Sequence, residues 1–139
     1  MRCSMNVDYL RVSVTDRCNL RCIYCNPCGD HGGGDAAEIL SLDEICRIVR
    51  LCARCGIRRV RLTGGEPLLR RDIVDLVRRL ATIPGIEDLS LTTNGVQLAP
   101  KADELKAAGL MRVNISLDAV QELFFRHMTG SDLLAHVLA

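Results

Sequence analysis

The chain has 139 residues, with 18 Lys and Arg against 17 Asp and Glu, 48% hydrophobic residues and 3% aromatic residues. This length and apolar fraction suit one globular domain, and they argue against intrinsic disorder and, with no apolar run near ~18 residues, against a membrane span. The near-neutral charge and few aromatic side chains lack the basic, stacking surface of nucleic-acid binders, so we expect no nucleic-acid partner.

Strand-like and helical patterns alternate along the chain. We expect strands at residues 9–15, 58–63, 87–93 and 112–117, and helices from about 41 to 55, 69 to 82, 100 to 108 and 132 to 138. Ser41 and Glu44 form a capping box, and Leu42, Ile45, Ile48, Val49 and Cys52 lie on one apolar stripe. The alternation predicts an α/β fold of about four parallel βα units in one domain, 1–139.

Each predicted strand has one apolar and one polar face, because side chains alternate along a strand. The polar faces carry Arg11, Ser13 and Thr15; Arg59, Arg61 and Thr63; Ser90, Thr92 and Asn94; Asn114, Ser116 and Asp118. An antiparallel sheet with one wet face would explain the pattern, but long helical crossovers disfavour it. We favour a curved, incomplete barrel with helices outside and a polar, ligand-binding interior. The pairs Arg70–Arg71 and Arg78–Arg79 are expected on solvated helix faces.

Eight cysteines are unusual for this length. The amino-terminal residues carry charge where a signal peptide needs its apolar stretch, so we expect a reducing cytoplasm and free thiols rather than a disulfide framework. Four cysteines fall within 11 residues, and the others are spread: Cys18, Cys22, Cys25 and Cys28, then Cys3, Cys46, Cys52 and Cys55. Cys52 is expected to pack in the core, and the sequence assigns no role to Cys3, Cys46 or Cys55.

The loop after the first strand contains a C-x3-C-x2-C run, Cys18 to Cys25. Three cysteines can bind three irons of a [4Fe–4S] cluster and leave the fourth iron open to a chelating ligand. Cys28 could complete a closed four-thiolate site. A zinc site and a chance cluster of thiols also stay open.

A second motif, Thr63-Gly64-Gly65-Glu66-Pro67, ends the second strand. It is either a tight turn before a helix or a place where glycine backbone approaches a small ligand and Glu66 meets an ammonium group. Asn94 and Asp118, at strand ends, are as readily turn formers as ligands.

Together these motifs resemble those of radical S-adenosylmethionine (SAM) enzymes and, within that superfamily, the GTP 3′,8-cyclase family. The similar segments are Asp8–Cys25, Gly56–Asp72, Leu89–Gly95 and Leu105–Asp118. The resemblance implies a partial TIM-like β/α barrel and a [4Fe–4S] cluster that cleaves SAM reductively with electrons from a separate donor. The implied reaction converts GTP to (8S)-3′,8-cyclo-7,8-dihydroguanosine 5′-triphosphate, the first step of molybdenum cofactor biosynthesis.

The resemblance also implies roles for individual residues. The cluster ligands would be Cys18, Cys22 and Cys25; SAM would contact Tyr24, Gly65 and Ser116; GTP would contact Arg11, Arg61 and Thr92. No residue is assigned as an acid, base or nucleophile.

Two departures from the family pattern bear on this interpretation. Asn26 stands where the family usually has Met, and family members are more than twice this length, with a second three-cysteine cluster in the part that has no counterpart here. We therefore expect an amino-terminal fragment that is inactive alone and could dimerise through its open sheet edge. The alternatives are another radical SAM enzyme, such as a peptide maturase, or a non-catalytic iron–sulfur or zinc module.

Overall fold

The computed structural model describes residues 7–25 and 39–139, so the predictions for Cys3, Asn26 and Cys28 lie outside the described residues. The elements in chain order are β1 (Tyr9–Ser13), α1 (Leu42–Arg54), β2 (Arg59–Thr63), the 3-10 turn η2 (Pro67–Leu69), α2 (Ile73–Ala81), β3 (Asp88–Thr93), the 3-10 turn η3 (Ala99–Lys101), α3 (Ala102–Ala107), β4 (Arg112–Ile115), α4 (Glu122–Thr129) and α5 (Leu134–Leu138). Within these two described ranges, every helix is too short or too polar to cross a membrane.

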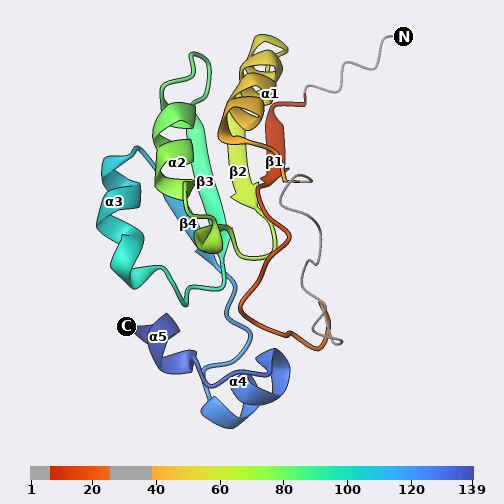
Figure 1. The fold of residues 1–139 in the computed structure, drawn as a ribbon, viewed down its shortest axis with the longest axis vertical. Coiled ribbons are helices and arrows are strands. Elements are labelled where there is room, and N and C mark those ends of the chain that lie inside the picture. Colours follow the sequence, from red (N-terminus) through yellow and green to blue (C-terminus); the bar gives the residue numbers. More distant parts are fainter. Residues whose placement is uncertain (1–6, 26–38) are drawn as a thin grey trace.

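The four strands form one parallel sheet in the order β1-β2-β3-β4. Helices α1, α2 and α3 lie along one face of the sheet, and α4 and α5 lie beyond its carboxyl ends (Figure 1). The predicted parallel βα units are confirmed and the antiparallel alternative is wrong. With helices on one face and four strands in the described residues, the fold is an incomplete barrel.

The core lies between the apolar face of the sheet and the helices. Val60, Leu62, Leu89 and Leu91 are fully buried there, against side chains of the first two helices that include Val49, Ile73, Leu76, Val77 and Leu80. Burying one such side chain contributes about 1.5–3 kcal/mol relative to leaving it in water. All four residues of β4 are exposed instead, because no further strand or helix covers this edge in the described part of the chain.

Helix α1 begins with the predicted capping box: Ser41 Oγ accepts from Glu44 N at 3.3 Å, and Glu44 Oε2 accepts from Ser41 N at 2.8 Å. The predicted stripe is wrong at one position, because Ile48 is exposed and Cys46 is buried in its place. The helix rests on the sheet along Ile45, Cys46 and Val49, a narrower face than the stripe assumed. Cys46, to which sequence analysis assigned no role, is therefore a core side chain.

Helix α2 begins at Ile73 rather than at residue 69. Arg70 leaves the helical path, with φ −70° and ψ 123°, because its side chain turns inward. Its Nη1 donates to the carbonyl oxygens of Val14 and Leu40, each at 2.9 Å, and its Nε donates to Asp72 Oδ1 at 2.6 Å. The prediction of a solvated Arg70 is wrong: this side chain joins the segments on either side of residues 26–38.

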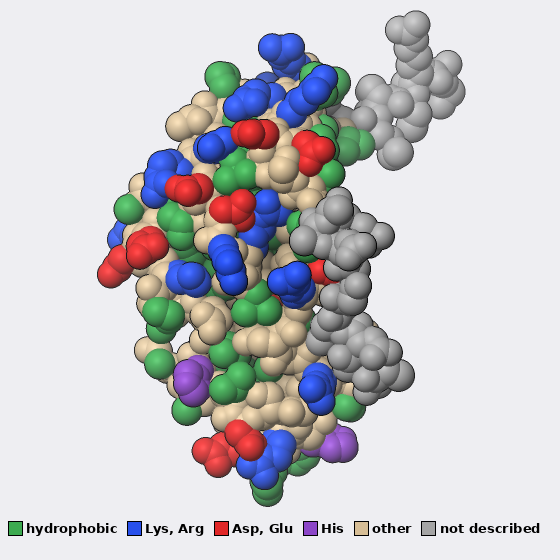
Figure 2. All heavy atoms as spheres, viewed as in Figure 1, with side chains coloured by type: hydrophobic (Ala, Val, Ile, Leu, Met, Phe, Trp, Pro, Cys, Tyr) green, Lys and Arg blue, Asp and Glu red, His purple; other side chains and the backbone are tan. Residues whose placement is uncertain are grey.

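The other three arginines of the two predicted pairs are exposed, as expected. Arg78 pairs with Asp75, and Arg79 pairs with Asp43 of α1. The helix-covered side of the molecule carries interspersed basic and acidic side chains (Figure 2). Such exposed ion pairs contribute little to stability, and this face shows no concentration of one charge.

Helix α4 was not predicted. Of its apolar side chains only Phe125 is buried, whereas Leu123 and Phe124 are exposed. The helix therefore lacks the buried apolar stripe from which the other helices were predicted. Its carboxyl end accepts two backbone hydrogen bonds from the cysteine loop, Arg21 N to Thr129 O at 2.8 Å and Ile23 N to Met128 O at 3.0 Å. The helix therefore supports the loop that carries Cys18, Cys22 and Cys25.

Candidate functional site

The predicted site residues converge on one cavity of about 210 Å³ at the carboxyl ends of the strands. Residues 18–25 form one wall, the turn 64–66 another, and the ends of β3 and β4 a third. The predicted residues that line it are Arg11, Cys18, Cys22, Tyr24, Cys25, Gly65, Thr92 and Ser116. Only Arg61 of the predicted set is not in the lining. Ligands of open parallel sheets bind in this position relative to the strands.

The two glycines of the turn allow the cysteine loop to pack against it. Gly65 N donates to Thr15 O at 2.7 Å, and Glu66 N donates to Arg17 O at 2.6 Å. A Cβ atom at Gly64 would lie 2.5 Å from Thr15 O, and one at Gly65 would collide with Arg17 O. The close approach that the glycines permit is thus first of all to this chain's own backbone, at the wall of the cavity.

Glu66 is 1% exposed and serves mainly as an internal acceptor. Its Oε1 accepts from Leu68 N at 2.9 Å and from Thr93 Oγ1 at 2.7 Å, and its Oε2 accepts from Asn94 N at 2.7 Å. These bonds occupy three of the roughly four acceptor positions of a carboxylate. Most of the acceptor capacity of Glu66 is therefore used within the protein, because the side chain ties the turn to the end of β3. Of the two alternatives for this motif, the tight turn agrees with these bonds, and little of the carboxylate is left for an ammonium group.

The three cysteines of the loop differ in their surroundings. Cys18 and Cys22 are half-buried and Cys25 is exposed, and all three are free thiols. Burial raises the pKa of the Cys18 and Cys22 thiols, because it disfavours the charged thiolate. For Cys18, hydrogen bonds from the backbone of Leu20 and Asn19 act against that rise in pKa. At Cys22 the side chain of Tyr24 acts against the rise in pKa in the same way.

The donor set fits an iron–sulfur cluster. Within residues 7–25 and 39–139, no three His, Cys, Asp or Glu side chains converge closely enough to hold one ion. In a cubane each thiolate binds a different iron, so its ligands need to face one cavity rather than one point. Three soft thiolates on one wall of the cavity meet that requirement.

Tyr24 joins the cysteine loop to the end of β4. Its hydroxyl donates to Asp118 Oδ2 at 2.5 Å, and this hydrogen bond, more than burial, raises the pKa of Tyr24. Ser116 is placed by its own backbone, since Ser116 N donates to Thr93 O at 2.8 Å. Asp118, which the sequence left between turn former and ligand, thus holds the ring of Tyr24 beside the cavity.

The polar face of the sheet carries four arginines, of which two are neutralised. Arg59 pairs with Asp8 at 2.7 Å, and Arg112 pairs with Asp88. Among the described residues Arg11 and Arg61 have no carboxylate partner. Arg61 lies 5.5 Å over the ring of Tyr9, and its Nε is buried without a hydrogen-bond partner in the described part of the chain. An unpaired guanidinium with an unmet donor is suited to an anionic ligand.

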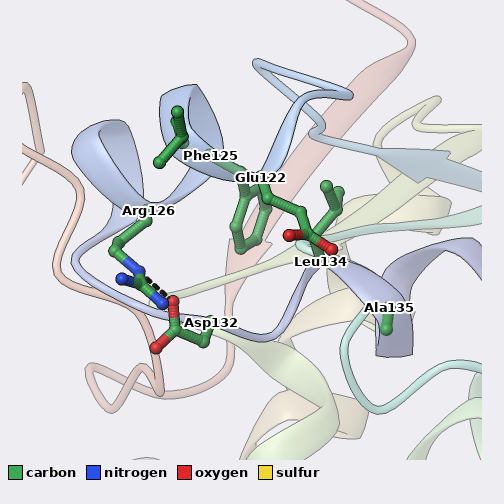
Figure 3. Close-up of a pocket in the computed structure, with 7 residues that line it drawn as sticks. Glu122, Phe125, Arg126, Asp132, Leu134 and Ala135 are labelled. Carbon is green, nitrogen blue, oxygen red and sulfur yellow. Dashed lines mark hydrogen bonds and ion pairs between the residues drawn. The ribbon is translucent and has the colours of Figure 1, made fainter.

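A second cavity, of about 240 Å³, lies between α4 and α5. Arg126 pairs with Asp132 across it, with Phe125 and Leu134 beside them (Figure 3). It contains none of the predicted site residues.

Comparison with known proteins decides the family. The model of the radical SAM superfamily matches residues 12–138. The chain belongs to the radical SAM superfamily. The fold is also similar to that of a solved structure, Streptococcus suis SuiB bound to S-adenosylmethionine, with a TM-score of 0.73. The superposition covers 91% of this chain and 28% of that chain, at 20% sequence identity.

Curated relatives are much more similar in sequence than SuiB. This radical SAM chain is 53% identical to a GTP 3′,8-cyclase of Listeria monocytogenes over 131 residues, 94% of the chain and 39% of the relative. It is 56% identical to a GTP 3′,8-cyclase of Heliobacterium modesticaldum over 124 residues, 89% of the chain and 38% of the relative. The chain therefore spans less than half the length of the curated relatives it matches.

Proposed function

We propose that this chain supplies the cluster- and SAM-binding part of a GTP 3′,8-cyclase. The observation that carries the proposal is the joint placement of the cysteine loop, the glycine turn and the ends of β3 and β4 around one cavity. The 53% identity to a GTP 3′,8-cyclase over nearly the whole chain supports this choice within the superfamily. Likeness to SuiB at 20% identity concerns the fold alone and does not favour peptide modification.

In this proposal Cys18, Cys22 and Cys25 hold a [4Fe–4S] cluster with one open iron, and Tyr24, Gly65 and Ser116 contact SAM. When bound, the cluster and SAM supply a one-electron reductive cleavage that begins hydrogen abstraction from the substrate. The chain's own task is to place the two reactants and keep water away. Leu20 and Phe125, both nearly fully buried, are apolar side chains in the lining of the cavity.

Arg11, Arg61 and Thr92 bind GTP in this proposal. Arginine suits a triphosphate because its planar guanidinium donates to two phosphate oxygens at once and keeps its charge when desolvated. The two arginines are in register on neighbouring strands and lack carboxylate partners among the described residues. The neighbouring Arg59 and Arg112 are already paired with carboxylates, so their positive charge is partly neutralised within the protein.

The proposal extends to the setting of the reaction. A one-electron cleavage requires an external electron donor, and thiol ligands require a reducing compartment, so we place the chain in the cytoplasm. We also propose that residues 1–139 belong to one radical SAM core domain. The exposed edge strand β4 is the surface through which we expect any homodimer to form.

The test is anaerobic reconstitution of the 139-residue chain with iron and sulfide, followed by electron paramagnetic resonance of the reduced cluster with and without SAM. We expect a cluster signal that SAM alters. A signal indifferent to SAM would indicate a closed, non-catalytic iron–sulfur module and overturn the proposal.

Two serine substitutions give a matched control for the ligand assignment. Cys22→Ser removes a proposed ligand, and we expect it to abolish cluster assembly. Cys55→Ser changes an exposed cysteine at the end of α1, outside the cavity, and should leave iron content and spectrum unchanged. Equal iron loss in both variants would contradict the assignment.

A further inference from the structure

The end of β3 approaches the cysteine loop through one side chain, that of Asn94. Its Nδ2 donates to Asn19 Oδ1 at 2.8 Å and lies 4.0 Å from Cys18 Sγ. Asn19 is the residue next to Cys18, so both contacts act at the first cysteine of the loop. Among the described residues no other side chain of the sheet donates to a sulfur of this loop.

Asn94 is itself held firmly in place. Its backbone N donates to Glu66 Oε2 at 2.7 Å, and its Oδ1 accepts from Val96 N at 3.1 Å. The Oδ1–Val96 bond fixes the orientation of the amide, because it leaves Nδ2 on the side of the loop. The buried Glu66 carboxylate in turn anchors the residue to the glycine turn. The amide is therefore a preset donor aimed at the loop.

We propose that Asn94 is a positioning residue that sets the Cys18 end of the loop and donates its second N–H toward the Cys18 sulfur. The effect of the N–H on a cluster ligand rests on the proposed function, whereas the positioning of the Cys18 end of the loop does not. An N–H group facing a thiolate ligand stabilises the more negative, reduced state of an iron–sulfur cluster and so raises its reduction potential. Partners that orient a metal ligand commonly change metal affinity about 10–100-fold when removed.

The first experiment needs no cluster. In the metal-free chain, the alkylation rates of Cys18 and Cys25 are measured by peptide mass spectrometry for wild type, Asn94→Leu, Asn19→Leu and Asn114→Leu. The rates compared are the limiting values reached at a pH at which both thiols are ionised, so that they report the access and nucleophilicity of each thiolate and not its population. Asn114 is an exposed asparagine of the neighbouring strand β4, and it makes no side-chain hydrogen bond within the described ranges. We expect Cys18 to react several-fold faster in Asn94→Leu and Asn19→Leu, with Cys25 and the Asn114→Leu control unchanged.

The second experiment measures the reduction potential of the reconstituted cluster in the same variants. Asn94→Leu is neutral and close in size, so it removes the N–H donor without adding charge. We expect the equilibrium constant for one-electron reduction to fall about tenfold, which corresponds to about 59 mV. In Asn19→Leu the Asn94 amide still faces Cys18, and the fall should be smaller.

The outcomes separate this inference from the proposed function. An unchanged Cys18 rate in Asn94→Leu, a parallel rise at Cys25, or a wild-type potential would overturn the role of Asn94. If no cluster assembles even in wild type, the proposed function fails while the alkylation rates still judge the positioning role. If Asn94→Leu does not fold, Asn94→Asp keeps the acceptor for Val96 N and loses both N–H donors, with Asn114→Asp as its charge control.

Discussion

Arg11 and Arg61 lie opposite each other on β1 and β2, in register, on the sheet face away from the helices. Neither has a carboxylate partner within the described residues, whereas Arg59, two residues from Arg61 on the same face, is bound to Asp8. Arg59 and Arg61 thus differ although they lie on one strand and one face: Arg59 is neutralised by a carboxylate, and Arg61 is not. The difference gives a direct test of anion binding at this face.

We expect Arg61→Gln to weaken GTP binding by the chain roughly 10–100-fold, because a hydrogen bond to a charged group contributes about 1.5–3 kcal/mol. Isothermal titration calorimetry at fixed salt measures this effect. Arg59→Gln is the matched control and should change the affinity little, since Asp8 already engages that side chain. Equal losses in the two variants would mean that general charge, rather than the free Arg61, attracts the nucleotide.

Gly65→Ala should disturb the cysteine loop rather than the rest of the fold. The added Cβ would collide with Arg17 O, and relieving such overpacking costs about 1–3 kcal/mol. Because the carbonyl belongs to the loop, we expect a lower thermal midpoint and a clear fall in iron bound per chain after reconstitution.

Gly56→Ala provides the contrast for this prediction. Gly56 has φ +102° and an open surrounding, so alanine there costs about 1–2 kcal/mol through backbone conformation alone. Its thermal midpoint should fall while its iron content stays at the wild-type value. A similar iron loss in both glycine variants would argue that cluster loading follows overall stability, not the fit between turn and loop.

Arg70→Lys should destabilise the fold although it keeps the charge. Lysine cannot reproduce the fork that reaches Val14 O, Leu40 O and the Asp72 carboxylate together. Leaving these acceptors unmet should lower the free energy of unfolding by about 1–3 kcal/mol, as measured by urea titration. The adjacent and exposed Arg71→Lys should stay within about 0.5 kcal/mol of wild type. A loss in Arg71→Lys as large as in Arg70→Lys would contradict this role of the Arg70 side chain.

The Arg70–Asp72 pair also predicts a pH dependence. The hydrogen bond from Arg70 holds the pKa of Asp72 below its ordinary value of 3.8. A carboxyl whose pKa is lower in the folded state contributes stability above its unfolded pKa and loses it as pH falls through the folded value. The thermal midpoint of wild type should therefore exceed that of Asp72→Asn near neutral pH, and the difference should shrink as pH falls below 3.8.

Asp75→Asn serves as the reference for this measurement. Asp75 pairs with Arg78, but both side chains are more than half exposed, so the pair contributes little at any pH. A constant difference between wild type and Asp72→Asn down to the acid limit would show that Arg70 does not act on the Asp72 carboxylate in this way.

The sequence alone determined the strand faces, the start of the first helix and the position of the cysteine loop, because the signals for these features are local in the chain. Strand alternation placed Arg11, Arg61 and Thr92 on one face, the capping box marked the start of α1, and the cysteine spacing identified the loop. Each of these signals depends on residues within a few positions of one another along the chain.

Only the tertiary structure decided how the side chains share their partners. The Glu66 carboxylate accepts hydrogen bonds from Thr93 and Asn94, and Arg70 turns inward to donate to Val14 O. The Asn94 amide in turn reaches the Cys18 end of the loop. These contacts join residues 27 to 76 positions apart, and nothing local in the sequence distinguishes them from a free ligand or a solvated charge. A hydrogen bond depends on distance and direction in space, and these are fixed only once the strands, the turn and the loop have packed together.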